Sequence, residues 1–310
     1  MQNEHIPVLL DEAIAGLNIN PDGIYVDCTL GGAGHASEIL RRLSAQGFLY
    51  CFDQDNYSVL RGKERLSNIS DNFTVIEDNF LNLKKHLEIL GVNKVDGILY
   101  DLGVSSFQLD IGERGFSYNF DAKLDMRMDQ SQGLTAYDIV NNYSISELKK
   151  IFYEYGEERF APRIAKRIII EREKKPIETT FELVEVIKKA IPAATRRSGG
   201  HPAKKVFQAL RIAVNNELEV FEKSLQDALT ILNPQGRIVV ISFHSLEDKI
   251  CKACFKEKVN IQIPRGLSIK EKDIIREYRL VNHKVITSSE EELARNHRAH
   301  SAKLRIIEKL

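Results

Sequence analysis

Four short apolar runs occupy the first hundred residues, and each is followed by a polar turn and then by a segment with helical spacing. The runs cover 24–26, 48–52, 74–76 and 97–100. Each is continuously apolar rather than alternating, which is typical of strands that are covered by helices on both faces. Repeated strand–turn–helix units of this kind predict an α/β fold built on a parallel sheet.

The composition is that of an ordinary globular chain. It has 310 residues, of which 43% are hydrophobic and 28% are charged, enough to bury a full core without disulfides or structural metals. No apolar run approaches the roughly 20 residues that a membrane span needs, and the N-terminus lacks the pattern of a secretory leader. We therefore expect a cytoplasmic protein that makes no membrane contact.

The cysteine pattern agrees with that compartment. Cys28 and Cys51 stand singly in strand-like runs, whereas Cys251 and Cys254 form one C-x-x-C in a helix-like segment. We interpret this pair as neighbours on a helix; metal binding and redox chemistry are the alternatives.

After residue 101 the strand pattern gives way to helical spacing. Two groups of apolar residues carry it: Ile145, Leu148, Phe152 and Tyr155, then Phe181, Val184, Ile187 and Ile191. This spacing predicts an all-helical insertion over 109–205 within a discontinuous domain formed by 1–108 and 206–310.

Sheet elements return in the last third of the chain. One long helix is predicted from Pro202 to the stop signal at Asn233, followed by a strand at 237–243 and a helix from Leu246 to about Phe255. The runs at 278–287 and 303–307 predict an antiparallel pair at one edge of the sheet.

The formal net charge of zero conceals a separation of charge along the chain. Residues 1–162 hold 14 basic and 25 acidic groups, 163–211 hold 13 and 5, and 212–310 hold 17 and 14. The central stretch, with a net charge of +8, contains Arg196, Arg197, Lys204 and Lys205. A solvated helix face is the ordinary interpretation of such a run, and binding of a polyanion is the alternative.

A glycine-rich turn follows the first apolar run. It reads Gly31-Gly32-Ala33-Gly34-His35 and opens a helix-like segment, so its backbone could approach a ligand closely. Ser37 stands where a dinucleotide fingerprint needs its third glycine. The turn alone therefore indicates a nucleotide-like ligand only weakly.

Carboxylates end two of the other runs. Asp53 ends the second run and could accept both hydroxyls of a ribose. It could instead cap the next helix, although Asp55 is better placed for that role. Asp101 ends the fourth run and could orient an exocyclic amine and stabilise the charge that develops on it. A structural carboxylate that caps the next turn is the alternative for Asp101.

Blocks of sequence along nearly the whole chain resemble the RsmH (MraW) family. These blocks are 5–10, 27–35, 101–106, 113–117, 124–128, 155–160, 207–211, 242–248 and 301–305. Members of this family use S-adenosylmethionine to methylate N4 of a cytosine in the decoding centre of 16S ribosomal RNA. The resemblance implies a class I methyltransferase fold, Rossmann-like and mostly parallel, in which the antiparallel edge pair distinguishes the sheet from that of a dehydrogenase.

The resemblance also implies roles for individual residues in the cofactor site. Ala33, Gly34 and His35 would line the methionine end of S-adenosylmethionine. Asp53 would hold the ribose and Phe80 would pack on the adenine, although Phe80 judged alone could be a core residue. Asp101 and Gln108 would complete the pocket, from which S-adenosylhomocysteine would leave as the product. No metal is required, and Asp101 is the one catalytic residue that we predict.

Contacts with RNA are expected mainly from the helical insertion and its basic stretch, with the small ribosomal subunit as the partner. The candidates are Asp125, Arg127, Arg196, Arg197, Lys204, Lys205 and His244. Asp125 and Arg127 could instead form a structural ion pair. His244 and Ser242 have no matching acid at a suitable spacing for nucleophilic catalysis, and Glu247 and Asp248 are expected to cap the following helix.

Some features differ from the family or leave alternatives open. Ala33 stands where the family usually has glycine. A DNA amino-methyltransferase would usually show Pro-Pro and an aromatic residue where this chain has Leu102-Gly103-Val104. An RNA-binding assembly factor with a vestigial cofactor site is a second alternative, and a nicotinamide dehydrogenase a distant third. The sequence does not decide between a monomer and a homodimer.

Overall fold

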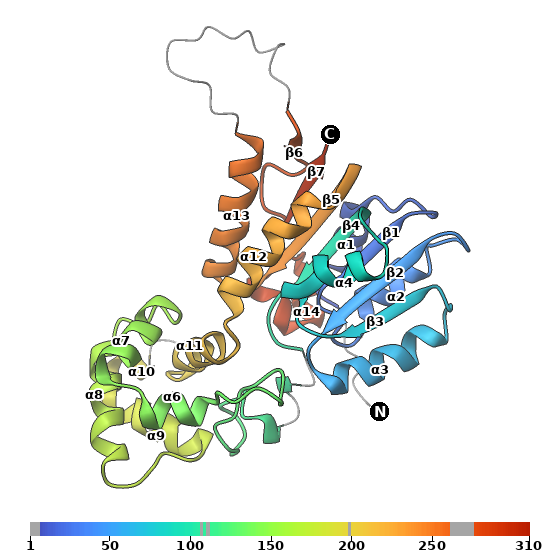
Figure 1. The fold of residues 1–310 in the computed structure, drawn as a ribbon. Helices are drawn as coiled ribbons and strands as arrows, with labels where there is room; N and C mark the ends of the chain where they lie inside the picture. The colour runs from blue at the N-terminus through green and yellow to red at the C-terminus, as the bar shows by residue number, and fades with distance from the viewer. Residues whose placement is uncertain (1–6, 106–107, 110–111, 198–199, 261–275) are drawn as a thin grey trace, which may run out of the picture. The chain divides into compact units, whose positions relative to one another are not determined.

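The computed structural model describes residues 7–310 except 106–107, 110–111, 198–199 and 261–275 (Figure 1). The side chains of Arg197 and His297 lie outside the described part, as do His5, Ile6 and Ser106 of the motif blocks. The chain forms two compact units, one made of residues 1–103 and 218–310 and the other of residues 104–217.

The first unit is built on a seven-stranded sheet in the order β3-β2-β1-β4-β5-β7-β6. Its strands are β1 (Ile24–Asp27), β2 (Phe48–Asp53), β3 (Phe73–Glu77), β4 (Val95–Asp101), β5 (Leu232–Ser242), β6 (Tyr278–Leu280) and β7 (Lys303–Lys309). Strands β1 to β5 pair in parallel, whereas β7 is antiparallel to both β5 and β6. This topology confirms the predicted class I methyltransferase sheet with its C-terminal antiparallel edge pair.

Helices cover both faces of this sheet, as the continuously apolar runs predicted (Figure 1). They are α1 (Leu10–Leu17), α2 (Gly34–Leu40), α3 (Asn56–Ser67), α4 (Leu83–Ile89), α12 (Glu217–Thr230), α13 (Ser245–Val259) and α14 (Glu290–Arg295). Successive residues of β5 show the two layers. Val239 and Ile241 pack in the core with α1, α2 and α3, whereas Ile238 and Val240 pack in the core with α4, α12 and α13.

The cysteines belong to these cores. Cys251 and Cys254 lie on α13 and pack in the same core as Cys28, and all four thiols are buried and free. This confirms the interpretation of the C-x-x-C as helix neighbours. None of the described helices combines the length and the hydropathy that crossing a bilayer requires.

The second unit consists of helices around a separate apolar core. These helices are α6 (Ala136–Asn142), α7 (Ile145–Glu154), α8 (Ala161–Arg172), α9 (Thr180–Ala190), α10 (Ala193–Arg197) and α11 (Lys204–Asn215). Capping boxes begin three of them at Thr135, Ser144 and Thr179, where hydroxyl and carboxylate side chains satisfy the first backbone N–H groups. Ile145 and Phe181, expected on buried faces, lie in first turns and are exposed.

The prediction of one long helix from Pro202 to Asn233 is wrong. The chain leaves helical geometry at Asn216, whose φ is 49°, so α11 and α12 are separate helices. The Asn215 side chain donates to the carbonyl oxygens of Met126 and Arg211 and accepts from the N–H of Met128, which fixes the end of α11. Apolar residues of α11 pack in the core of the second unit, so this compact unit spans 104–217 where the sequence predicted an insertion over 109–205.

Candidate functional site

Three aspartates end adjacent parallel strands of the first unit. Asp27 ends β1, Asp53 ends β2 and Asp101 ends β4, and β1 lies between the other two strands. Because the carboxyl ends of parallel strands meet at one edge of a sheet, these side chains line the edge where ligands bind in open α/β sheets. Sequence reasoning singled out Asp53 and Asp101 but missed Asp27, although it opens the motif block at 27–35.

Asp27 and Asp101 are joined through Thr29. The Oδ1 atom of Asp27 accepts from the Thr29 N–H at 3.0 Å, and the Thr29 hydroxyl accepts from the Asp101 N–H at 2.7 Å. Burial raises the pKa of Asp27 to about 6. Burial also raises the pKa of Asp101 well above its usual range, and the charges of Asp27 and Glu247 act in the same direction. Among the described residues, the buried Oδ1 of Asp101 has no hydrogen-bond partner.

Asp53 ties the glycine-rich turn to the end of β2. Its Oδ2 accepts from the Gly31 N–H at 2.8 Å, and its Oδ1 accepts from the Asp55 N–H at 2.9 Å. Asp55 is the residue that caps α3, through the N–H of Tyr57, so the alternative that Asp53 caps this helix is wrong. Burial raises the pKa of Asp53 to about 7.

The glycine-rich turn is closely packed. Ala33 is fully buried with a φ of 57°, a left-handed conformation that favours glycine. A Cβ atom on Gly34 would come within 2.2 Å of Pro7 Cγ. Glycine at position 34 therefore lets the segment at Pro7 lie against the first turn of α2.

His35 lies behind this turn and reaches Asp101. The side chain of His35 is only 6% exposed. Nε2 is 3.1 Å from the carbonyl oxygen of Val8, and Nδ1 is 3.5 Å from Oδ2 of Asp101. The structure thus brings together two residues that the sequence analysis assigned to one cofactor site.

Phe80 follows β3 in the short 3₁₀ helix Phe80–Asn82. Its half-buried ring packs edge-on against Tyr100 at a centroid distance of 5.6 Å, and its carbonyl oxygen accepts from the Ser224 hydroxyl at 3.0 Å. The Asn79 amide donates to Oε1 of Gln54 at 2.8 Å, which links this segment to the residue after β2. These contacts fix the position of a partly exposed aromatic ring at the same edge of the sheet.

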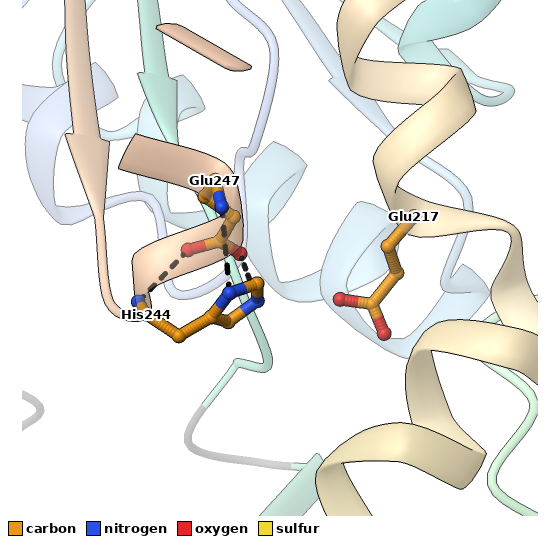
Figure 2. A group of neighbouring side chains, drawn as sticks. All are labelled: Glu217, His244 and Glu247. Atoms are coloured by element: carbon orange, nitrogen blue, oxygen red, sulfur yellow. Dashed lines mark hydrogen bonds and ion pairs between the residues drawn. The ribbon is translucent and has the colours of Figure 1, made fainter. Parts of the chain in front are cut away.

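His244 and Glu247 form a capping box at the start of α13 (Figure 2). The Oε2 of Glu247 accepts from the Phe243 N–H at 2.8 Å, and the His244 Nε2 lies 3.1 Å from Oε1 of Glu247. The predicted capping role is confirmed for Glu247, whereas Asp248 instead pairs with Arg305 and Lys303. The side chain of His244 is 10% exposed, which leaves little of it for contact with RNA.

The remaining predicted site residues lie in the second unit. Gln108 is buried and its Oε1 accepts from the Ser105 N–H at 3.0 Å. Asp125 and Arg127 form a two-pronged ion pair, with contacts of 2.9 and 2.8 Å, and Arg127 also donates to backbone carbonyl oxygens. This pairing lowers the pKa of Asp125 although burial opposes it. The geometry is that of the structural ion pair considered as the alternative.

The basic stretch is partly neutralised within the second unit. Several of its charged groups pair with glutamates: Arg167 with Glu171, Lys174 with Glu171, Lys175 with Glu182, Lys188 with Glu185 and Arg211 with Glu217. Lys205 donates to the Glu157 carbonyl oxygen, Arg196 is exposed on α10, and the Arg197 side chain lies outside the described part. Lys189 and Lys204 are exposed and form no ion pair with any described residue.

The charges at the strand ends restrict which ligand can bind there. In the described part of the chain, Asp27, Asp53 and Asp101 form no ion pair with a lysine or arginine. A pyrophosphate would find no positively charged side chain at these strand ends, whereas the oxygen atoms of the carboxyl groups could accept hydrogen bonds from a ribose and from a positively charged group. Oδ1 of Asp101 is buried and has no hydrogen-bond partner among the described residues, so it could accept a hydrogen bond from the positively charged group of a ligand.

A family profile and a curated relative each match this chain over nearly its full length. A family profile described as the MraW methylase family matches residues 2–310. Ribosomal RNA small subunit methyltransferase H of Exiguobacterium sibiricum is 57% identical over 308 residues, covering 99% of this chain and 98% of the relative. An rRNA methylase from Streptococcus thermophilus, of solved structure, is 13% identical with a TM-score of 0.42, covering 97% of this chain and 93% of its own. A Streptococcus mutans protein solved with SAH is 12% identical with a TM-score of 0.43, covering 99% and 100%.

Proposed function

Because the chain belongs to the MraW methylase family, we propose that it methylates N4 of a cytosine in the decoding centre of 16S ribosomal RNA. The methyl donor is S-adenosylmethionine, and S-adenosylhomocysteine is the product. The relative with 57% identity is named for small-subunit ribosomal RNA, which supports that substrate class and a cytoplasmic location. The observation that carries the proposal is the edge of three carboxyl groups at adjacent strand ends, which form no ion pair with a lysine or arginine of the described part.

The residues at this edge fit the parts of the cofactor. Asp53 would accept hydrogen bonds from the ribose hydroxyls, and the half-buried Phe80 ring would pack on the adenine. Asp101, whose Oδ1 has no hydrogen-bond partner among the described residues, would hold the ammonium group, and Ala33, Gly34 and His35 would line the methionine end. For Gln108, which belongs to the second unit, the proposed contact with the cofactor rests on the family resemblance alone. When bound, S-adenosylmethionine supplies a methyl group on a positively charged sulfur.

The chain's own residues must prepare a weak nucleophile. The N4 amine of cytosine is conjugated with its ring, so an acceptor has to orient its protons and stabilise developing positive charge. Asp101 is the candidate for this role, and the target base has to leave its stack to reach it. No thiolate is needed for transfer to an amine, in agreement with the burial that raises the pKa of Cys28 and Cys51.

The helical unit is proposed to hold the RNA through exposed cations that form no direct ion pair with a carboxylate. Lys189 and Lys204 meet this condition among the described residues, whereas Lys175 pairs with Glu182 at 2.8 Å. Replacing Lys189 and Lys204 by Gln should weaken RNA binding and reduce the slope of log affinity against log salt by about 0.7 for each lost contact. The matched control Lys175→Gln should change this slope much less; an equal change would contradict this assignment.

The test of the proposed function maps the methyl group after transfer from labelled S-adenosylmethionine. Small ribosomal subunits from cells lacking the enzyme, naked 16S ribosomal RNA and DNA serve as parallel acceptors. A single label on N4 of a decoding-centre cytosine is expected. Label on DNA alone would favour a DNA amino-methyltransferase. RNA binding without transfer, unchanged when Asp53 is replaced, would favour an assembly factor. Sedimentation of the enzyme alone would decide whether it acts as a homodimer.

A further inference from the structure

The His35 ring lies between two oxygen atoms that differ in their hydrogen-bonding capacity: the carbonyl oxygen of Val8 and Oδ2 of Asp101. The Val8 carbonyl oxygen can only accept, so Nε2, at 3.1 Å, carries a hydrogen and donates it. A neutral imidazole has one ring hydrogen, and Nδ1 in this tautomer therefore presents a lone pair. That lone pair faces Oδ2 of Asp101 at 3.5 Å. Two lone pairs repel each other, so an attractive contact requires one proton between the two residues.

The surroundings decide which residue holds that proton before a ligand binds. Burial raises the pKa of Asp101, and the carboxylates of Asp27 on β1 and Glu247 on α13 raise it further. No lysine or arginine of the described part opposes them. The proton therefore resides on Asp101, which faces Nδ1 of His35 as a carboxylic acid.

A cation at the other carboxyl oxygen reverses this preference. Oδ1 of Asp101 is buried without a hydrogen-bond partner among the described residues, and a positive charge there favours the ionised form of Asp101. We propose that His35 is a positioning residue that takes the proton of Asp101 when the cofactor's ammonium group binds Oδ1. The Oδ2–H bond of Asp101 breaks, an Nδ1–H bond forms on His35, and no proton enters or leaves the protein.

This inference rests on the proposed function, since the ligand is the proposed cofactor. It removes Asp101 from the pH dependence of the affinity for S-adenosylmethionine, because the protein keeps the proton of Asp101 when the cofactor binds. Without a base at Nδ1, Asp101 would have to release the proton to solvent. Affinity would then rise up to tenfold for each pH unit below the pKa of Asp101.

The experiment counts protons released on binding. S-adenosylmethionine is titrated calorimetrically into the full-length protein at pH 6.5, in buffers that differ in ionisation enthalpy. His35→Gln is the informative variant because its amide can still donate to the Val8 carbonyl while nothing replaces Nδ1. His283→Gln, at an exposed histidine of the same unit, is the control. Wild type and the control should release the same small number of protons, and His35→Gln should release up to one more. Equal release by wild type and His35→Gln would overturn the inference.

A second measurement applies if His35→Gln does not fold or bind. The ¹⁵N resonance of His35 Nδ1 in the wild-type protein should change from an unprotonated to a protonated ring nitrogen when S-adenosylmethionine is added. An Nδ1 that stays unprotonated in the complex would overturn the inference. No binding of S-adenosylmethionine to the wild-type protein would instead refute the proposed function, so the two failures are distinguishable.

Discussion

The replacement of Asp27 by Asn tests whether the ionised carboxylate at this position lowers the free energy of unfolding. Asp27 is 1% exposed, and burial raises its pKa from 3.8 to about 6. The folded state binds the proton of Asp27 more tightly than the unfolded state does. The stabilisation that comes from this tighter binding is complete below pH 3.8 and is lost as the pH rises through about 6. At about 1.36 kcal/mol for each pKa unit, the ionised Asp27 costs the folded state about 3 kcal/mol at pH 8. An Asn at this position cannot ionise, and its Oδ1 can still accept from Thr29.

We therefore expect Asp27→Asn to raise the free energy of unfolding by up to about 3 kcal/mol at pH 8 and by almost nothing at pH 4. Urea unfolding followed by circular dichroism at a series of pH values measures the difference. Asp71→Asn, at an exposed aspartate of the same unit, is the control and should show no such trend. A difference between Asp27→Asn and wild type that does not change with pH would refute the reasoning.

Three further substitutions test other parts of the structure. Gly34→Ala should weaken cofactor binding and lower the free energy of unfolding by about 1–3 kcal/mol, because the new Cβ would lie 2.2 Å from Pro7 Cγ; Gly133→Ala, where nothing lies within 4 Å, should be nearly neutral in denaturant unfolding. Ala33→Gly should raise the free energy of unfolding by up to about 1 kcal/mol, since it relieves a φ of 57°; a lower stability would contradict this. Arg127→Gln should destabilise the helical unit by about 1–3 kcal/mol in the absence of RNA, and unchanged thermal unfolding would favour a direct role in RNA binding.

The layered sheet could be predicted because its signal is local. Continuous apolar runs that end in Asp53 and Asp101 define both the strands and the edge where ligands bind. The position of Cys251 and Cys254 as neighbours on a helix could likewise be predicted from helical periodicity alone. These features depend on neighbours within a few residues, so the sequence determines them directly.

The break between α11 and α12 could not be predicted in this way. Apolar spacing continues through Asn216, and the left-handed turn there depends on contacts of Asn215 with Met126 and Met128, which are far away in sequence. Asp27 was missed for a similar reason, since its proximity to Asp101 arises from the pairing of β1 with β4. The pairing of Asp125 with Arg127 was foreseen as an alternative, but only side-chain geometry could decide it.

We propose that the edge formed by Asp27, Asp53 and Asp101 binds S-adenosylmethionine. The most direct measurement titrates S-adenosylmethionine and NAD separately into the wild-type protein and into Asp101→Ala. S-adenosylmethionine should bind the wild type and should bind Asp101→Ala about 30 to 150 times more weakly, the equivalent of about 2–3 kcal/mol for a buried charge partner. NAD, whose pyrophosphate would face the carboxyl groups, should not bind measurably. Equal affinity of both proteins for S-adenosylmethionine, or comparable binding of NAD, would contradict the account.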